Sequence, residues 1–327
     1  MRKVSVQTMM ELATKPDPVG RLLLHEELSR AKPDKRVLQE LLRCFPERIR
    51  ATNDESKSLP LHVTALNIHS VDRSTFELIV EAWPEAVGKP NAFGLLPIHK
   101  AVMAKLPRST PPNMALLDRL VAAHPAGLLA KNKEGMTPLH LFINYHAKPL
   151  AEIIEFLIEK QPKAAEVVDA YGHTPLHKLV SKRPDEEIIN CLTTVIDAYP
   201  AALLLGDSQG RVPLHWAVAC RDKPDLEIVA ELVENAPEAV NKKDMEGFKP
   251  IQRLMSRGNN RCGATCLMLA QKEEELAQKR VVQRKELEKE HAKDEEMLSK
   301  LKPHDPKYKL IRQRSNARLT ILLEKKD

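Results

Sequence analysis

The sequence is short of aromatic residues, glycine and long apolar runs, and each shortage excludes a class of protein. Its 327 residues include two Trp, four Tyr, six Phe and 11 Gly. No run reaches the roughly 18 apolar residues of a membrane span, and residues 1–17 lack the apolar stretch of a signal peptide. Five scattered cysteines, an odd number in a long chain, do not make a disulfide framework. We therefore expect a cytoplasmic or nuclear protein that is not secreted and has no transmembrane segment.

Catalytic signatures are also missing from the sequence. It has no Gly-x-x-x-x-Gly-Lys-Ser/Thr loop, no Gly-x-Gly-x-x-Gly, no Gly-x-Ser-x-Gly and no His-Glu-x-x-His. Apolar residues make up 43% and charged residues 29%, with a net charge of +6, so the chain can form a packed core and is only mildly basic. We expect a folded protein that is not an enzyme and needs no cofactor.

The abundant residue is proline, with 24 copies, and its placement is periodic. A tetrad that ends in Pro-Leu-His or Pro-Ile-His recurs, with degenerate copies at each end of the series. The last residues of the tetrads are His25, His62, His99, His140, His177, His215 and Gln252. They are separated by 37, 37, 41, 37, 38 and 37 residues, and a glycine lies five positions before each of them except His62, where Lys57 stands. The chain is therefore an array of repeats.

A second proline keeps phase with the tetrads. It precedes the last residue of the following tetrad by 15 or, once, 16 positions, and its copies are Pro46, Pro84, Pro125, Pro162, Pro200 and Pro237. Before each of these prolines, apolar residues at minus 8, minus 5 and minus 4 form one face of a helix, as with Leu192, Val195 and Ile196. We expect the second proline to end that helix and to begin an extended segment that leads to a turn.

Proline in the tetrad suits the first turn of a helix, where its missing N–H would be unpaired, so each repeat should contain two helices. Over residues 20–270 the sequence resembles the ankyrin repeat. The shared features are a turn with glycine, a Pro-Leu-His helix start and an apolar second helix. The resemblance implies an all-α solenoid of helix pairs with short β-hairpin-like turns. It also implies that the tetrad residues are structural, with each imidazole bonded to the backbone of an adjacent repeat. These residues are Pro60, His62, Pro97, His99, Pro138, His140, Pro175, His177, Pro213 and His215.

The sequence departs from the family pattern in two ways. Only Thr137 and Thr174 offer a hydroxyl that can cap the first helix, so the helices that follow Leu59, Leu96, Val212 and Lys249 should start less firmly. The period of about 37 residues exceeds the family's 33, and the extra residues fall between the two helices of a repeat. The loop at 106–113, which holds three prolines, shows this most clearly.

The tetrad histidines do not suit a shared metal. Packed helices lie roughly 8 to 10 Å apart, whereas zinc holds its ligands at about 2 Å. Cys262 and Cys266 have no second pair nearby, so a small buried residue is the better interpretation of each than a metal or redox site. We predict no metal.

The residue after each tetrad should project on or near the concave side, which the first helices line in the ankyrin family. Leu141, Tyr145 and Trp216 form a candidate hot spot for a protein partner. The alternative is that Trp216 packs over a neighbouring repeat and Tyr145 caps a loop. A positive rim is the second candidate feature, with ordinary solvated lysines as its alternative. Its residues are Lys100, Lys105, Lys178, Lys182, Arg183 and Arg221.

The composition changes at residue 271, where glycine and proline disappear until Pro303. We divide the chain into an N-terminal cap (1–19), the solenoid (20–270), a charged helix (271–302) and a C-terminal amphipathic helix (303–327). The charged helix should continue the second helix of the last repeat, either as a solvated single helix or as a weak coiled coil along Leu276, Leu287 and Leu298. The last helix could fold back as a hairpin or engage a partner.

Function follows from the repeats. We predict a non-catalytic scaffold or adaptor that binds another protein through the concave first-helix face and the turn tips. The alternative is binding of nucleic acid or an anionic membrane surface by the tail, where residues 271–327 hold 16 basic and 12 acidic residues. The identity of the protein partner does not follow from the fold.

Overall fold

The computed structural model describes residues 23–30, 32–53, 56–106, 112–183, 185–219, 224–256, 263–300 and 306–324. The predicted cap at 1–19 lies outside these ranges. The described residues contain helices and turns but no β-strand, as an all-α solenoid requires. None of the described helices combines the length and apolar character needed to cross a membrane.

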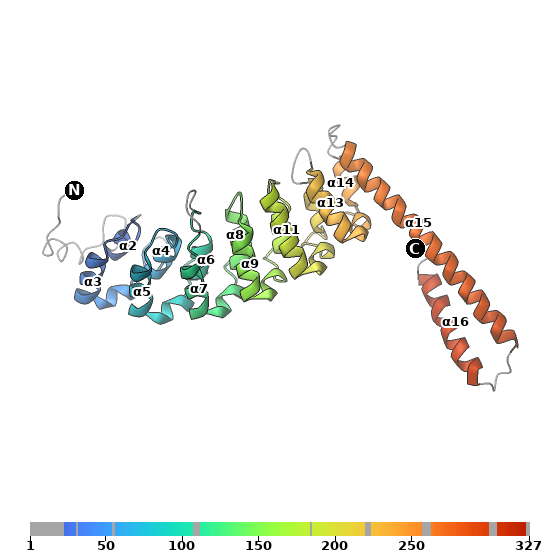
Figure 1. The fold of residues 1–327 in the computed structure, drawn as a ribbon, viewed down its shortest axis with the longest axis horizontal. Coiled ribbons are helices and arrows are strands. Elements are labelled where there is room, and N and C mark those ends of the chain that lie inside the picture. Colours follow the sequence, from blue (N-terminus) through green and yellow to red (C-terminus); the bar gives the residue numbers. More distant parts are fainter. Residues whose placement is uncertain are drawn as a thin grey trace.

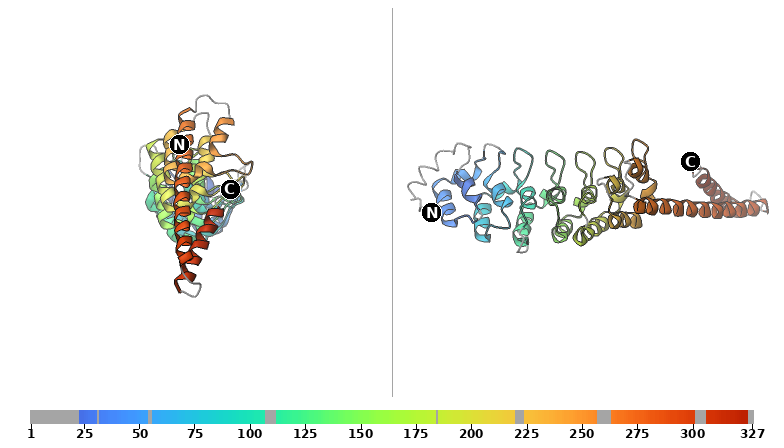
Figure 2. Two further views of the ribbon diagram at one scale, coloured as in Figure 1. Left: turned by 90° about the vertical axis from the view of Figure 1, so that its right-hand side faces the viewer. Right: turned by 90° about the horizontal axis from the view of Figure 1, so that it is seen from above.

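Helix pairs stack side by side into one elongated, gently curved array (Figures 1 and 2). The first helices of the pairs are α2 (Leu23–Leu28), α4 (Pro60–Leu66), α6 (Pro97–Val102), α8 (Pro138–Tyr145), α10 (Pro175–Leu179), α12 (Pro213–Ala219) and α14 (Pro250–Ser256). The second helices are α3 (Lys35–Cys44), α5 (Arg73–Ala82), α7 (Met114–Ala123), α9 (Ala151–Lys160), α11 (Glu186–Ala198) and α13 (Leu226–Asn235). In Figure 1, α4, α6 and α8 lie above α5, α7 and α9.

The tetrad proline is the first residue of every first helix from α4 to α14, as predicted. The capping differs from the expectation. Thr174 accepts the backbone N–H of His177, but the Thr137 hydroxyl is hydrogen-bonded to His140 Nδ1 instead and does not cap α8. The helices that lack a threonine still begin at the proline, and in α4, α6 and α12 the tetrad histidine accepts the backbone N–H of the residue before the proline.

The segment after the second proline is not extended, so that prediction was wrong. Each of these prolines is the first residue of a short 3₁₀ helix: η1 (Pro46–Arg50), η2 (Pro84–Gly88), η3 (Pro125–Leu129), η4 (Pro162–Ala165), η5 (Pro200–Leu204) and η6 (Pro237–Asn241). Proline ends one helix and begins the next for the same reason, since it lacks an N–H and has a fixed φ. The 3₁₀ turn also buries a small residue, such as Ala86 or Ala202, against the core.

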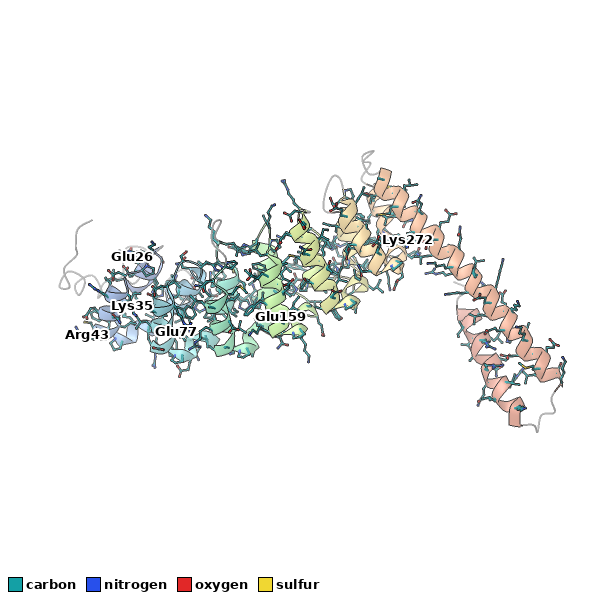
Figure 3. All side chains as sticks on the ribbon, viewed as in Figure 1. Glu26, Lys35, Arg43, Glu77, Glu159 and Lys272 are labelled. Carbon is teal, nitrogen blue, oxygen red and sulfur yellow. The ribbon has the colours of Figure 1, made fainter. Side chains whose placement is uncertain are left out.

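One continuous core runs through the stack. The apolar positions predicted for the second helices are buried, among them Leu192, Val195 and Ile196. The residues three positions after the five tetrads from His62 to His215 are buried as well, as in Ala65 and Ile143. Charged side chains lie along the outside, and Figure 3 labels examples from Lys35 of α3 to Lys272, close to where the long helix leaves the stack.

That long helix is α15 (Gly263–Lys300). Its first turns complete the last repeat, with Leu269 in the core, as predicted. The C-terminal helix α16 (Pro306–Glu324) folds back along α15 as a hairpin (Figure 1). The second half of α15 is therefore not a solvated single helix. Its buried and half-buried positions 284, 287, 291, 294 and 298 follow alternating steps of three and four.

The contact between α15 and α16 is polar at its centre, which the expectation of an amphipathic α16 did not anticipate. Asp294 is 1% exposed and forms ion pairs with Arg314 and Arg318. The buried Ser315 hydroxyl donates to Glu295 Oε1 at 2.6 Å. Leu310, in contrast, remains exposed. Ion pairs lie at the centre of the helix pair, and the buried apolar residues in it are Leu298 of α15 and Leu322 of α16.

Leu176→Ala should destabilise the solenoid by about 2 to 5 kcal/mol, because Leu176 is fully buried between repeats and the truncation leaves a cavity. Urea unfolding followed by circular dichroism measures this loss. A loss below about 0.5 kcal/mol, typical of a surface substitution, would show that Leu176 is not a core residue.

Candidate functional site

The tetrad histidines link each repeat to the next, which confirms the structural role expected of them. Each Nε2 donates to a backbone carbonyl 31 to 34 residues ahead. The pairs are His62 with Leu95 (2.8 Å), His99 with Ala130 (3.0 Å), His140 with His173 (3.0 Å), His177 with Arg211 (2.9 Å) and His215 with Phe248 (3.0 Å).

The other ring nitrogen fixes the tautomer. Nδ1 of His62, His99 and His215 accepts the backbone N–H of the residue before the proline, at 3.0 to 3.2 Å. In the last repeat, Gln252 Oε1 accepts the N–H of Lys249 in the same way, at 2.8 Å. With Nδ1 an acceptor, the proton lies on Nε2. In the described part of the chain, no group of three histidine, cysteine or acidic side chains could hold a metal.

Burial keeps these imidazoles neutral. It lowers the pKa of His62, His99, His140 and His177 from 6.5 to about 4, against the smaller opposing effect of the backbone carbonyls. A protonated ring would lose its acceptor at Nδ1 and would place an unpaired charge in the core. These histidines are therefore poor candidates for proton transfer near neutral pH.

Stability should fall as the pH drops from about 6.5 to about 4. In this window the unfolded chain binds protons at its histidines and the folded chain does not, so acid favours unfolding. Urea titrations at several pH values measure the slope. His177→Gln, which copies the glutamine at position 252 of the last repeat, should reduce the slope, and an unchanged slope would contradict the assignment.

The turns present a ladder of finger-like loops. Each begins with Asn or Asp whose Oδ1 accepts two backbone N–H groups, as Asp169 does from Tyr171 (2.8 Å) and His173 (2.9 Å). Neighbouring fingers are joined by one backbone bond, such as that from Ala170 N to Glu134 O at 3.0 Å. Glycine is needed here, because a Cβ on Gly135 would lie 2.5 Å from the Ala170 nitrogen. Lys57, the exception in the sequence, adopts the same left-handed region with φ 51°.

In three repeats, the residue after the tetrad reaches back to the residue that opens the turn of its own repeat, nine positions earlier. Lys178 Nζ lies 2.9 Å from Asp169 Oδ2, and Arg253 Nε lies 2.6 Å from Asp244 Oδ2. We call this series, one residue per repeat on the first helices, the follower row. It consists of Val63, Lys100, Leu141, Lys178, Trp216 and Arg253.

Trp216 is a packing residue in this row, which is the alternative left open by the sequence. Its Nε1–H donates to Asp207 Oδ2 at 2.9 Å, and its ring makes an edge contact with His173 of the preceding repeat at 4.8 Å between centroids. The Arg211 guanidinium lies over the ring and also pairs with Asp207. Burial alone would raise the pKa of Asp207, but the bonds from Arg211 and Trp216 hold it at about 2.

The other predicted binding residues differ in exposure and in their bonding partners. Leu141 is 4% exposed and belongs to the core, so its place in an exposed hot spot was wrong. Tyr145, at the end of α8, is 60% exposed. Lys178 is neutralised by Asp169, and Lys182 Nζ donates to the backbone oxygen of Asn144.

The positive rim is therefore weaker than predicted. Lys100 is half-buried and, within the described structure, makes no ion pair. Arg221 lies outside the described residues.

Sequence inspection overlooked the exposed apolar side chains at the turn tips. Phe93 and Tyr171 each lie two positions after the residue that opens a turn, and they are 54% and 60% exposed. Met245, one position after Asp244, is 77% exposed. The available signal was an apolar residue one or two positions before the turn glycine.

Comparisons with known proteins agree with this architecture. The family model described as the ankyrin repeat matches residues 209–245. Among solved structures, the chain is similar to the ankyrin repeat domain of Bcl-3, described as a unique member of the IkappaB protein family. The two share 19% identity with a TM-score of 0.54, over 72% of this chain and 94% of that one. No curated protein matches the chain. The chain therefore contains an ankyrin repeat at residues 209–245 and has the fold of an ankyrin-repeat domain, and such repeats generally mediate protein–protein interaction.

Trp216→Phe should destabilise the protein by about 1 to 2 kcal/mol, because it removes the donor to a buried carboxylate while it keeps most of the ring. Trp216→Ala should cost more, since the contacts with His173 and Arg211 are also lost. Urea unfolding measures both. An unfolding free energy unchanged in both variants would show that Trp216 is not needed for packing.

Proposed function

We propose that this protein is a non-catalytic scaffold or adaptor that binds another protein through its first-helix face and turn tips. The observation that carries the proposal is the exposure of Phe93, Tyr171 and Met245 on fingers whose backbone is already hydrogen-bonded from repeat to repeat. These side chains contribute little to the stack. Exposed apolar side chains on a rigid frame are typical of a surface that a partner covers.

The follower row supports the same conclusion. It runs along the first helices directly below the fingers, because its polar members bond the residues that open the turns. Apart from the buried Leu141, the residues of the row are half-buried, so a partner that crosses several repeats would meet one partly exposed side chain in most repeats: Val63, Lys100, Lys178, Trp216 and Arg253. A solenoid provides an extended binding surface of this kind.

The alternative, binding of nucleic acid or a membrane surface by the basic tail, receives no support from the described part of the hairpin. Arg312, Arg314 and Arg318 of α16 pair with Glu295, Asp294 and Glu290 of α15. These acidic partners reduce the charge that the helix can present to phosphate groups. The tail is better suited to supply a second contact for a protein.

The proposal is tested by affinity capture from cell extract with the full chain at low and moderate salt. Phe93→Ser with Tyr171→Ser should lose a protein partner that the wild-type chain retains at moderate salt, because the partner's apolar contacts are removed. Leu226→Ser, which also replaces an exposed apolar side chain but on the second helix α13, away from the first-helix face and the fingers, is the control and should retain the partner.

Two results would contradict the proposal. One is an undiminished set of captured proteins with the doubly substituted chain. The other is capture of nucleic acid alone, lost at moderate salt, which would favour the tail.

A further inference from the structure

The residue that opens a turn and the follower-row residue of the same repeat are chemically matched in four repeats. A carboxylate faces a cation or an N–H donor in three of them: Asp169 with Lys178 (2.9 Å), Asp207 with Trp216 (2.9 Å) and Asp244 with Arg253 (2.6 Å). In the fourth, the uncharged Asn132 shares its repeat with the buried Leu141. In the three repeats with a buried carboxylate, the follower-row residue supplies a hydrogen-bond donor to it. In the repeat with an uncharged amide, the follower-row residue is apolar.

The repeat that contains Asn91 and Lys100 breaks this matching. Asn91 Oδ1 accepts the backbone N–H groups of Phe93 (2.9 Å) and Leu95 (3.0 Å), so the other end of the amide is its NH₂ group. That NH₂ donates to Ser58 Oγ at 3.1 Å. Asp169 offers Lys178 a carboxylate oxygen, whereas the corresponding Asn91 offers Lys100 none.

Lys100 occupies the same place in its repeat as Lys178 does. The charge of each lysine lowers the pKa of the tetrad histidine one repeat earlier, His62 for Lys100 and His140 for Lys178. Within the described structure, no hydrogen bond or ion pair reaches the Lys100 ammonium.

Its neighbours in the follower row, Val63 and Leu141, are both apolar, and burial lowers the pKa of Lys100 itself. A half-buried cation without a counter-charge is costly, and an incoming anion would offset that cost.

An exposed aromatic ring lies at the same end of this repeat. Phe93 corresponds to Tyr171, whose ring lies 5.9 Å from that of His173, and His173 Nδ1 lies 3.1 Å from Lys178 Nζ. By this equivalence, Phe93 and Lys100 lie at the same end of the repeat, with Leu95 at the position of His173. That end offers one cation, one exposed aromatic ring and the second N–H of the largely buried Asn91 amide, whose first N–H bonds Ser58.

We propose that Lys100 and the amide of Asn91 bind a single carboxylate, from Asp or Glu, of an extended protein segment whose adjoining apolar side chain contacts Phe93. One ammonium between apolar neighbours matches one negative charge, whereas a phosphate group calls for several charged donors. This inference rests on the proposed function and names the chemistry of the partner.

Asn91→Asp tests the geometry without any partner. The new carboxylate should pair with Lys100 as Asp169 pairs with Lys178, and Ser58 can donate to it. The melting temperature should rise by about 2 °C or more. Lys163→Leu, which removes an exposed lysine on η4, is the control for a simple change in net charge and should leave the melting temperature unchanged. An unchanged or lower value for Asn91→Asp would overturn the inference.

A displayed library of random dodecapeptides, selected on the full chain, tests the ligand. The retained peptides should share an acidic position. The dissociation constant of one such peptide should rise at least about 10-fold when its Glu is replaced by Gln. Asn91→Asp, which fills the site from within, and Lys100→Leu, which copies the leucine at position 141, should weaken the Glu peptide equally, while Lys163→Leu should not.

The outcomes separate this inference from the proposed function. Peptides that bind without an acidic position, or that bind Asn91→Asp and Lys100→Leu undiminished, overturn the inference and leave the scaffold standing. A phosphoserine analogue bound more tightly than the Glu peptide, with the same dependence on Lys100, overturns the assignment to a carboxylate. A library that yields no peptide also overturns the inference. The proposed function is decided separately, by the capture experiment.

Discussion

The hydrogen bond from each tetrad imidazole to the backbone of the following repeat is the interaction on which the rest of the structure depends. A repeat of two short helices cannot bury its apolar face alone, so neighbouring repeats must pack at a constant spacing. His62, His99, His140, His177 and His215 provide that constancy, because each ring bonds its own helix start through Nδ1 and the next repeat through Nε2. The tetrad proline, two positions before the histidine, begins the helix, so the backbone N–H of the residue before it lies within reach of Nδ1.

A constant register turns a series of repeats into an ordered surface. Corresponding positions of successive repeats become neighbours, so residues about 37 positions apart in sequence lie side by side on the first helices. The turn residue then decides what its follower can do. Asp169 and Asp244 hold a cation inward, whereas the repeat with the uncharged Asn132 has the buried Leu141 at the same position. Exposed groups such as Phe93 are those that the frame does not use.

Much of this could be predicted from the sequence, because the stack is governed by local rules that repeat. The tetrad prolines and the apolar faces of the second helices follow from spacing, and the structural role of the histidines is implied by the resemblance to the ankyrin repeat. The 3₁₀ helices did not follow, since a proline that ends one helix can equally begin another. The burial of Leu141 also escaped prediction, because it depends on a side chain nine positions earlier that does not lie on the same helix.

The C-terminal hairpin shows a different limit. The break at Pro303 and Pro306 indicates two helices, but periodicity of apolar residues identifies a packed face only when that face is apolar. Here the centre of the contact is Asp294 with Arg314 and Arg318, so charge complementarity across 20 or more residues sets the pairing. An exposed Leu310 and a buried Ser315 reverse the usual expectation.

The most direct test of the central claim is the protonation state and tautomer of the tetrad histidines in solution. Correlation of ring nitrogens with ring protons by NMR at neutral pH distinguishes the two tautomers from each other and from imidazolium. Five neutral rings with the proton on Nε2, protected from exchange with solvent, are the predicted result. Rings that carry the proton on Nδ1, or that average between tautomers like free imidazole, would show that the repeats are not linked through these side chains.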